Sequence, residues 1–164
     1  MRFAQNVSDR IFFMNNGIIY EEGTPQKIFT APEKNATKIF IQRLKTYEKV
    51  FDNAQINLLE VQSELEAFAR KQFMSGRQSM TLQLIFEELI HESLLKRGDE
   101  IFPVEMKIFY NDAQAECEIK IVTGGKKNNP LEDIDEISGA IIKGLIQSAE
   151  FKFDGKNILI LKVK

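Results

Sequence analysis

Residues 103–122 read PVEMKIFYNDAQAECEIKIV, and this stretch decides the fold of the second half of the chain. Apolar and polar residues alternate on both sides of Asn111-Asp112, a pair that favours a turn. The apolar positions are Val104, Met106 and Ile108 in the first run and Cys117, Ile119 and Ile121 in the second. The pattern predicts two antiparallel strands, 103–110 and 115–122, with one face of the sheet buried and the other exposed to solvent.

Helical patterns flank these two strands. Residues 80–96 place apolar side chains at helical spacing and predict the best-defined helix of the chain. A helix that carries Leu65, Phe68, Ala69 and Phe73 precedes it, and a helix over 133–148, with acids in its first turn, follows the strands. Residues 157–163 alternate and predict a last strand, whereas 55–61 fits either a short strand or a helix.

The first 50 residues have patterns of their own. Asn15-Asn16-Gly17 separates two apolar runs between Arg10 and Glu22, which predicts a β-hairpin. Thr24 followed by Pro25 predicts the capped start of a short helix. A second helix is predicted over 36–50 from the helical spacing of Ile39, Phe40, Arg43, Leu44 and Tyr47.

Together these patterns predict an α+β fold in two parts. The first part, residues 1–50, is expected to contain the hairpin and short helices. The second part, residues 51–164, is expected to be an α/β sandwich in which helices cover a mixed, mostly antiparallel sheet. With 164 residues, 43% of them hydrophobic, the chain is long enough for one moderate domain or two small units.

Composition and charge exclude several classes of function. Lys and Arg total 22 against 24 acids, so the chain lacks the broad basic surface that nucleic-acid binding requires. No apolar stretch approaches the roughly 20 residues that span a bilayer, and we expect no direct membrane insertion. The single cysteine, Cys117, excludes an internal disulfide and fits a reducing compartment, which makes the cytoplasm the expected location.

The first part of the chain resembles a known family. The residues that carry the resemblance are Met1-Arg2-Phe3-Ala4, Val7, Asp9-Arg10, Phe13-Met14, Gly17, Ile19, Glu22-Gly23, Pro25 and Ile28-Phe29, with a weaker continuation through Pro32, Thr37, Phe40 and Leu44. Over residues 1–45 this pattern is similar to the C-terminal end of the ATP-binding proteins of polar-amino-acid ABC transporters. In that family the stretch directly follows the switch histidine, and Met1 falls two positions after it.

The resemblance implies that this chain is not an enzyme by itself. In the family the Walker A loop, the Q-loop, the signature motif, the Walker B acids and the switch histidine all precede this stretch. The sequence contains no G-x-x-x-x-G-K-[ST] pattern, so the phosphate cradle of phosphoryl transfer is missing. ATP and magnesium are expected only for an implied full-length parent, whose partners would be transporter membrane subunits at the inner face of the plasma membrane.

Residues 54–164 resemble a second family more distantly. The predicted order of strand, helix, helix, strand, strand, helix, strand is similar to the histidine-kinase-type ATPase fold, particularly its anti-sigma-factor branch. Glu88 matches a glutamate of that family, and Glu92 stands where the family has a magnesium-binding asparagine. The family's adenine-binding aspartate is absent from the loop that contains Gly125, and Gly139 resembles the start of a later helix. These four residues are therefore vestigial nucleotide-binding candidates.

Each candidate also has a structural interpretation. Glu88 and Glu92 fit an acidic pair, four residues apart, on a solvated helix face. The segment 124–127, Gly-Gly-Lys-Lys, fits a solvated turn, with a phosphate-contacting loop as the alternative. His91 lacks the neighbours of a catalytic histidine, and residues 131–136 lack the oxygen spacing of a calcium loop, so no metal is expected.

The leading hypothesis is an accessory regulatory or dimer-forming domain at the end of an amino-acid importer's ATP-binding subunit. Because the isolated hairpin would expose backbone edges, we expect homodimerisation, docking on the second part, or local disorder. The competing hypothesis is a nucleotide-binding, kinase-like protein that retains ATP through Glu92. A third is an anti-sigma-type protein-interaction module.

Overall fold

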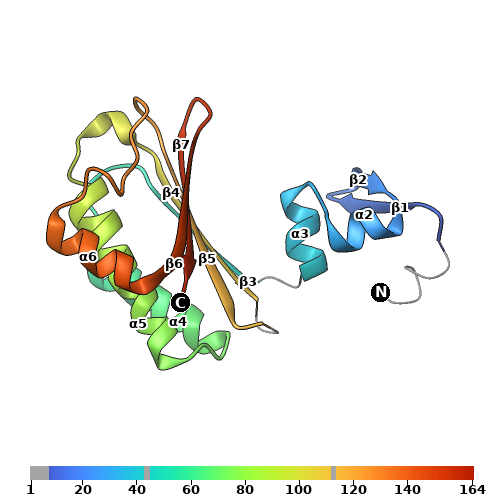
Figure 1. Cartoon of the computed structure of the whole chain (residues 1–164), viewed down its shortest axis with the longest axis horizontal. Coiled ribbons are helices and arrows are strands. Elements are labelled where there is room, and N and C mark those ends of the chain that lie inside the picture. Colours follow the sequence, from blue (N-terminus) through green and yellow to red (C-terminus); the bar gives the residue numbers. More distant parts are fainter. Residues whose placement is uncertain (1–7, 43–44, 112–113) are drawn as a thin grey trace. The chain divides into compact units, whose positions relative to one another are not determined.

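A computed structural model describes residues 8–42, 45–111 and 114–164 of the chain. It divides the chain into two compact units, Met1–Lys45 and Thr46–Lys164 (Figure 1). The division falls a few residues before the one predicted after residue 50. Several residues of the family resemblance and of the predicted turns, namely 1–7, 43–44 and 112, lie outside the described residues.

The first unit begins with the predicted hairpin. Strand β1 (Ile11–Asn15) pairs antiparallel with β2 (Ile18–Gly23). Asn16 and Gly17 join them with φ angles of 50° and 80°, the left-handed values that a type I′ hairpin turn requires. The prediction of a hairpin with an Asn-Gly turn is therefore confirmed.

Two helices follow the hairpin. Helix α2 (Pro25–Thr30) has Pro25 in its first turn, and the Thr24 hydroxyl accepts a hydrogen bond from the backbone N–H of Lys27 at 3.3 Å. This start agrees with the prediction. Helix α3 (Asn35–Gln42) is followed by a strand, β3 (Lys45–Phe51), so the predicted helix over 36–50 is wrong in its second half.

The reason lies in the period of residues 45–51. The even-numbered side chains are exposed, whereas Tyr47 and Lys49 are half-buried and Phe51 is buried, an alternation of period two. Tyr47 also fits the helical spacing that begins at Ile39, so the sequence pattern was ambiguous there. Pairing with the sheet of the second unit decides in favour of the strand.

The second unit contains a five-stranded sheet in the order β3-β4-β5-β7-β6. Strands β4 (Val104–Asn111) and β5 (Glu116–Thr123) are the two strands predicted from residues 103–122. Strand β7 (Asn157–Val163) pairs antiparallel with both β5 and β6 (Ile146–Phe153). The predicted α+β class and the antiparallel character of the sheet are confirmed.

Helices cover one face of this sheet (Figure 1). They are α4 (Leu58–Lys71), α5 (Gly76–Ile85), the π-helix η1 (Phe86–Leu94) and α6 (Glu136–Leu145). The core between the layers includes Leu65, Leu82, Ile85, Leu89, Ile90, Met106, Ile108, Ile119 and Leu161. Because α4 begins at Leu58, with the Asn57 side chain accepting from the N–H of Glu60, residues 58–61 are helical and the strand alternative for them is wrong.

The helix predicted over 80–96 is interrupted in its winding. After Ile85 the chain continues as a π-helix, and the N–H of Leu95 donates to the carbonyl of Ile90 at 2.8 Å, an i to i+5 bond. Ile85, Ile90 and Leu95, spaced by five residues, are all at most 2% exposed. This wider spacing keeps the apolar side chains on one face, and π-turns of this kind frequently occur at functional sites.

The third prediction that fails is the helix over 133–148. Helix α6 ends at Leu145, and residues 146–153 form β6, a strand that the sequence analysis missed. Most side chains of β6 are exposed, so the strand lacks a strong apolar alternation. Its hairpin partner β7, whose own alternation is clear, determines its conformation through the pairing of Phe151 with Leu159.

Candidate functional site

A pocket of about 520 Å³ lies at one end of the sheet of the second unit. It lies between the end of η1, the short 3-10 helix η2 (Asp99–Ile101) and the loop that follows β5. The residues around it include Arg97, Ile101, Thr123, Gly125, Lys126 and Asn157. Polar and basic side chains therefore meet at this place.

Asn157, the first residue of β7, organises the loop beside the pocket. Its side chain is 3% exposed. Its amide nitrogen donates to the carbonyls of Gly124 and Lys126, both at 2.9 Å, and its amide oxygen accepts from the N–H of Asn128 at 2.8 Å. One buried amide thus fixes the backbone over residues 124–128, because buried polar groups need such partners.

Arg97 holds the next part of the same loop. Its guanidinium donates to the carbonyls of Pro130 at 3.4 Å and Asp133 at 2.7 Å, and to the hydroxyl of Ser93 at 3.1 Å. It also forms an ion pair with the Asp133 carboxylate at 3.2 Å. The side chain is only 16% exposed, so Arg97 connects the end of η1 to the loop rather than pointing free into solvent.

The glycine pair of the loop is required by close packing. Gly124 donates its N–H to the carbonyl of Ile101 at 2.8 Å. A Cβ atom on Gly125, whose φ is +83°, would lie 3.3 Å from the carbonyl oxygen of Glu100. Both residues therefore let the loop approach η2 closely, while Lys126 and Lys127 remain exposed.

Glu88 faces helix α6. Its carboxylate accepts a hydrogen bond of 2.5 Å from the hydroxyl of Ser138, which is 6% exposed. Asp135 caps the same helix by accepting from the N–H groups of Ile137 and Ser138, and the Ser138 N–H holds the pKa of Asp135 below its usual value. Gly139 is buried next to Ser138, where a Cβ would lie 3.2 Å from Ile134.

Glu92 lies apart from Glu88 in a surface ion pair. Its carboxylate accepts from Lys96 and from Nδ1 of His91, the latter at 2.8 Å. The hydrogen bond from the Lys96 ammonium is the largest cause of a lowered pKa of Glu92; burial opposes it, and the His91 contact lowers the pKa further. The side chain is 42% exposed, and its two partners are close in sequence, His91 directly before it and Lys96 four residues after it.

The structure thus distributes the four predicted site residues over three places. Gly125 borders the pocket, Glu88 and Gly139 lie at the contact between η1 and α6, and Glu92 lies in the surface ion pair. Sequence analysis missed Arg97 and Asn157, which build the loop of the pocket. The sequence indicates them only by position: Arg97 is a polar residue directly after the predicted helix 80–96, and Asn157 is a polar residue at the start of the predicted strand 157–163.

Two further observations concern metal ligands and the cysteine. Within residues 8–42, 45–111 and 114–164, no three His, Cys, Asp or Glu side chains group as metal ligands would. Cys117 is buried, and burial, followed by the charge of Glu118, raises the pKa of its thiol to about 12. A protonated thiol of this kind is a poor nucleophile.

Over the described part of the chain, no helix is both long enough and apolar enough to cross a bilayer. No protein-family model matches the sequence.

Part of the chain is similar to known ATP-binding proteins. It is 41% identical over 44 residues to the L-cystine import ATP-binding protein TcyC of Bacillus subtilis, which covers 27% of this chain and 18% of that protein. It is 43% identical over 44 residues, with the same coverage, to the glutamine transport ATP-binding protein GlnQ of Geobacillus stearothermophilus. A probable amino-acid ABC transporter ATP-binding protein of Sinorhizobium fredii is 45% identical over 42 residues, which cover 26% of this chain and 16% of that protein.

The chain therefore spans less than a fifth of the length of these relatives. The matched length is close to that of the first unit, which runs from Met1 to Lys45. The chain contains a segment that is similar to part of the ATP-binding proteins of amino-acid ABC transporters.

Proposed function

We propose that this chain is the C-terminal portion of an amino-acid transporter's ATP-binding subunit and carries an accessory regulatory or dimerisation domain. The single observation that carries the proposal is the agreement of two lengths. A similarity of 42 to 44 residues to amino-acid ABC transporter ATP-binding proteins has the length of one compact unit, and the remaining chain forms a second unit. The first unit is the transporter part, and the second unit is the accessory part.

Exposed apolar side chains of the first unit support its place in a larger ATPase domain. Phe12, Met14, Ile18, Ile19 and Phe40 are each at least 50% exposed. Side chains of this size in a small hairpin unit are typical of a surface that packs against further protein. In the proposed parent, the ATPase core would cover them, and ATP with magnesium would bind to that core.

The second unit has the attributes of an accessory domain. It has its own core between one sheet and one helical layer, its Cys117 thiol is buried, and its described residues hold no group of three potential metal ligands. Its role is regulation or dimerisation, through contacts with other protein chains or through binding of a small effector. Membrane subunits of a transporter would be partners of the parent, at the inner face of the plasma membrane.

Two experiments test the proposal. An antibody against the second unit should detect, in the native organism, a polypeptide well above the 18.9 kDa of this chain, and peptide mapping should find Walker motifs in it. A native product of 18.9 kDa would contradict the transporter assignment. The purified chain should hydrolyse no ATP above background, and turnover that is proportional to its concentration would contradict the non-catalytic role.

A nucleotide-binding, kinase-like domain is the second candidate, and one observation favours it. The second unit has the order strand, helix, helix, strand, strand, helix, strand, strand, with a pocket next to a glycine-containing loop. This order differs from the predicted one in two strands: the first strand is β3 rather than a strand at 55–61, and β6 is additional. Magnesium-dependent affinity for ATP would favour this candidate, or the related anti-sigma-type interaction module, over an effector-free accessory domain.

A further inference from the structure

Strand β6 forms an open edge of the sheet. It is the last strand in the order β3-β4-β5-β7-β6, and among the described strands it pairs with β7 alone. Residues 147–150 are exposed, as are Lys152 and Phe153, so solvent reaches the edge along most of its length. An edge strand carries unpaired backbone donors and acceptors, which makes it a template for another strand.

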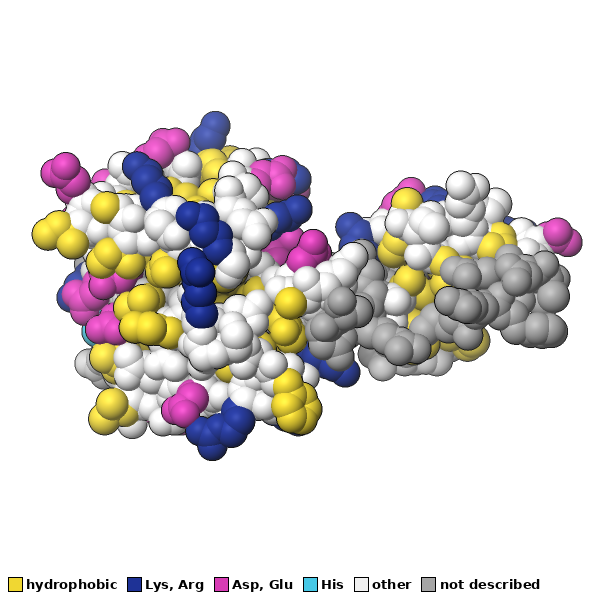
Figure 2. Space-filling model, turned by 60° about the horizontal axis from the view of Figure 1, so that its bottom comes forward, with side chains coloured by type: hydrophobic (Ala, Val, Ile, Leu, Met, Phe, Trp, Pro, Cys, Tyr) yellow, Lys and Arg dark blue, Asp and Glu magenta, His cyan; other side chains and the backbone are white. Residues whose placement is uncertain are grey.

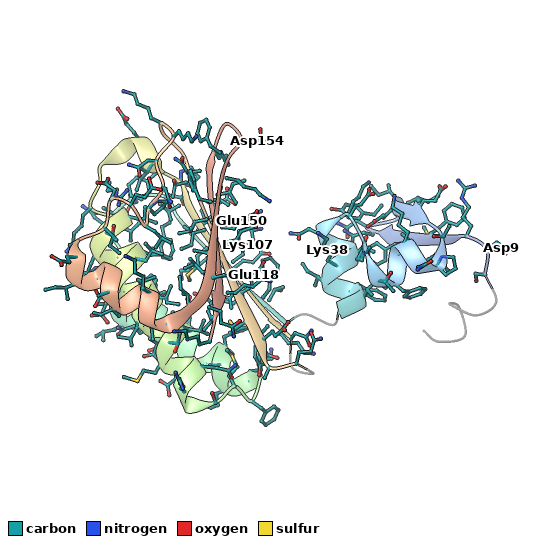
Figure 3. All side chains as sticks on the ribbon, viewed as in Figure 1. Asp9, Lys38, Lys107, Glu118, Glu150 and Asp154 are labelled. Carbon is teal, nitrogen blue, oxygen red and sulfur yellow. The ribbon has the colours of Figure 1, made fainter. Side chains whose placement is uncertain are left out.

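The side chains of β6 differ between the two faces of the sheet. Ala149, Phe151 and Phe153 lie on the face that the helices cover, because they pair with Leu161, Leu159 and Asn157, which are buried there. Ser148, Glu150 and Lys152 lie on the opposite face. Figure 3 shows Glu150 on β6 and Asp154 at the tip of the β6–β7 hairpin.

This pattern is self-complementary in one antiparallel register. When Phe151 faces the same residue of a second copy, Glu150 faces Lys152 of that copy, and its own Lys152 faces the other Glu150. A shift by two residues one way places Glu150 opposite Glu150, and a shift the other way places Lys152 opposite Lys152. Opposite charges across strands stabilise a pair and like charges destabilise it, so charge selects the Phe151-centred register.

Phe153 gives the same register an apolar contribution. It is 42% exposed at the edge of the helix-covered face. In the Phe151-centred register it faces Ala149 of the second copy, a small residue beside which an aromatic ring fits. The two-fold arrangement would therefore cover Phe151 and Phe153 of both copies on one face while four charges pair on the other.

We propose that a second copy of this chain docks on β6, so that two five-stranded sheets join into one continuous sheet through antiparallel β6–β6 pairing centred on Phe151. The contact is isologous, as two-fold dimers require. This proposal rests on the dimerisation role proposed above and names the surface through which the dimer forms. In the separate chain Glu150 and Lys152 pair with each other at 2.9 Å, and in the dimer they form a cluster of four alternating charges.

Charge reversal tests the register. Sedimentation of the full chain over a concentration series should show a dimer, and Glu150→Lys or Lys152→Glu should raise the dissociation constant about tenfold or more, because two attractive contacts become repulsive. An equimolar mixture of the two variants should dimerise again, since the charges that the two substitutions introduce then face each other with opposite signs. Lys120→Glu, an equal charge change on the central strand β5, is the matched control and should leave dimerisation unchanged.

Cross-linking gives a second measurement that does not depend on affinity. Directly opposite residues of antiparallel strands have Cα atoms about 4.5–5.5 Å apart, within the range of a disulfide. Phe151→Cys introduces a thiol at a partly exposed position, and the native Cys117 is buried, so mild oxidation should link two chains through residue 151. Ser148→Cys is the control, because its two copies would lie roughly 20 Å apart in this register.

The outcomes distinguish a failure of the proposed β6 interface from a failure of the proposed dimerisation role. A dimer that neither reversal weakens, and that Ser148→Cys cross-links as readily as Phe151→Cys, would overturn the β6 interface while leaving dimerisation by another surface. A chain that stays monomeric throughout the series would overturn both the interface and the dimerisation role. Rescue in the mixture of the two reversed variants, together with cross-linking at residue 151, supports the proposal.

Discussion

Asn157 determines the shape of the pocket loop through three hydrogen bonds from one buried amide. Asn157→Ala would leave two carbonyls and one N–H of residues 124–128 without this partner. The expected loss is about 2–3 kcal/mol of unfolding free energy, the usual cost of unsatisfied buried polar groups. Urea unfolding measures it, with Asn53→Ala on an exposed turn as the control. A loss equal to that of the control would contradict this role for Asn157.

Glu64 gives a prediction in which pH is the variable. Its carboxylate accepts from Lys49 at 2.8 Å and from the Tyr47 hydroxyl at 2.7 Å, and these contacts lower its pKa, with the Lys49 contact as the largest cause. Because the pKa of Glu64 is lower in the folded state, its ionised carboxylate stabilises the fold at pH values above its unfolded-state pKa of about 4.3. This stabilisation is lost as the pH falls through the folded-state pKa.

Glu64→Gln should therefore be less stable than the parent at neutral pH, by at most about 1 kcal/mol because the side chain is 35% exposed and partly screened. The difference should shrink as the pH falls below about 4. Chemical unfolding at a series of pH values measures it, and Glu66→Gln, on the exposed face of the same helix, is the control. A difference that stays constant from pH 7 to acid would rule out this linkage.

At the residue scale, sequence predicts local chemistry and misses distant partners. The Asn16-Gly17 turn and the Thr24 cap depend on neighbouring residues, so their patterns were sufficient. The hydrogen bond between Ser138 and Glu88 joins residues 50 positions apart, and no local pattern indicates it. Glu88 was therefore recognised as a candidate without the contact that now explains its orientation.

The π-helix η1 is the element whose geometry most affects the core. Ile90 lies in it with no exposed surface. Ile90→Ala should destabilise the second unit by about 3–4 kcal/mol, because a buried methyl-rich side chain leaves a cavity. Thermal unfolding followed by circular dichroism measures the effect. Glu92→Ala on the exposed face of the same element should leave the midpoint nearly unchanged, and equal effects would contradict the assigned orientation.

Elements were predictable where one period dominates. Strands β4, β5 and β7 alternate clearly between buried and exposed positions, and the pattern found all three. Strands β3 and β6 lie at the edges of the sheet, where fewer side chains are buried, and their conformation depends on pairing with distant strands. That is why the predicted helices over 36–50 and 133–148 extended into them.

The whole molecule consists of two units with separate cores. Ile28, 1% exposed, lies in the core of the first unit. Ile28→Ala should therefore lower the protection of amides in β1 and β2 against hydrogen exchange, while amides of β4 and β5 keep theirs. Mass spectrometry of exchanged peptides measures both regions in one experiment. Equal loss of protection in the two units would show that they unfold as one body.

Surface charge at this scale is mixed. Figure 2 shows hydrophobic side chains interspersed with charges of both signs over the visible face of the larger unit. The net charge of −2 is small, so no single-sign surface dominates. Such a surface lacks the excess of positive charge that attracts a polyanion.

The proposed function, the C-terminal portion of an ATP-binding subunit with an accessory domain, implies that this chain does not bind nucleotide by itself. Isothermal titration of the purified chain with ATP and with ADP, each with and without magnesium, tests it most directly. The account predicts no binding heat up to millimolar nucleotide, because Glu92 is held by Lys96 and His91 and the loop of Gly125 is closed on η2. Micromolar, magnesium-dependent binding that Glu88→Gln or Glu92→Gln abolishes would contradict it and favour a kinase-like nucleotide site.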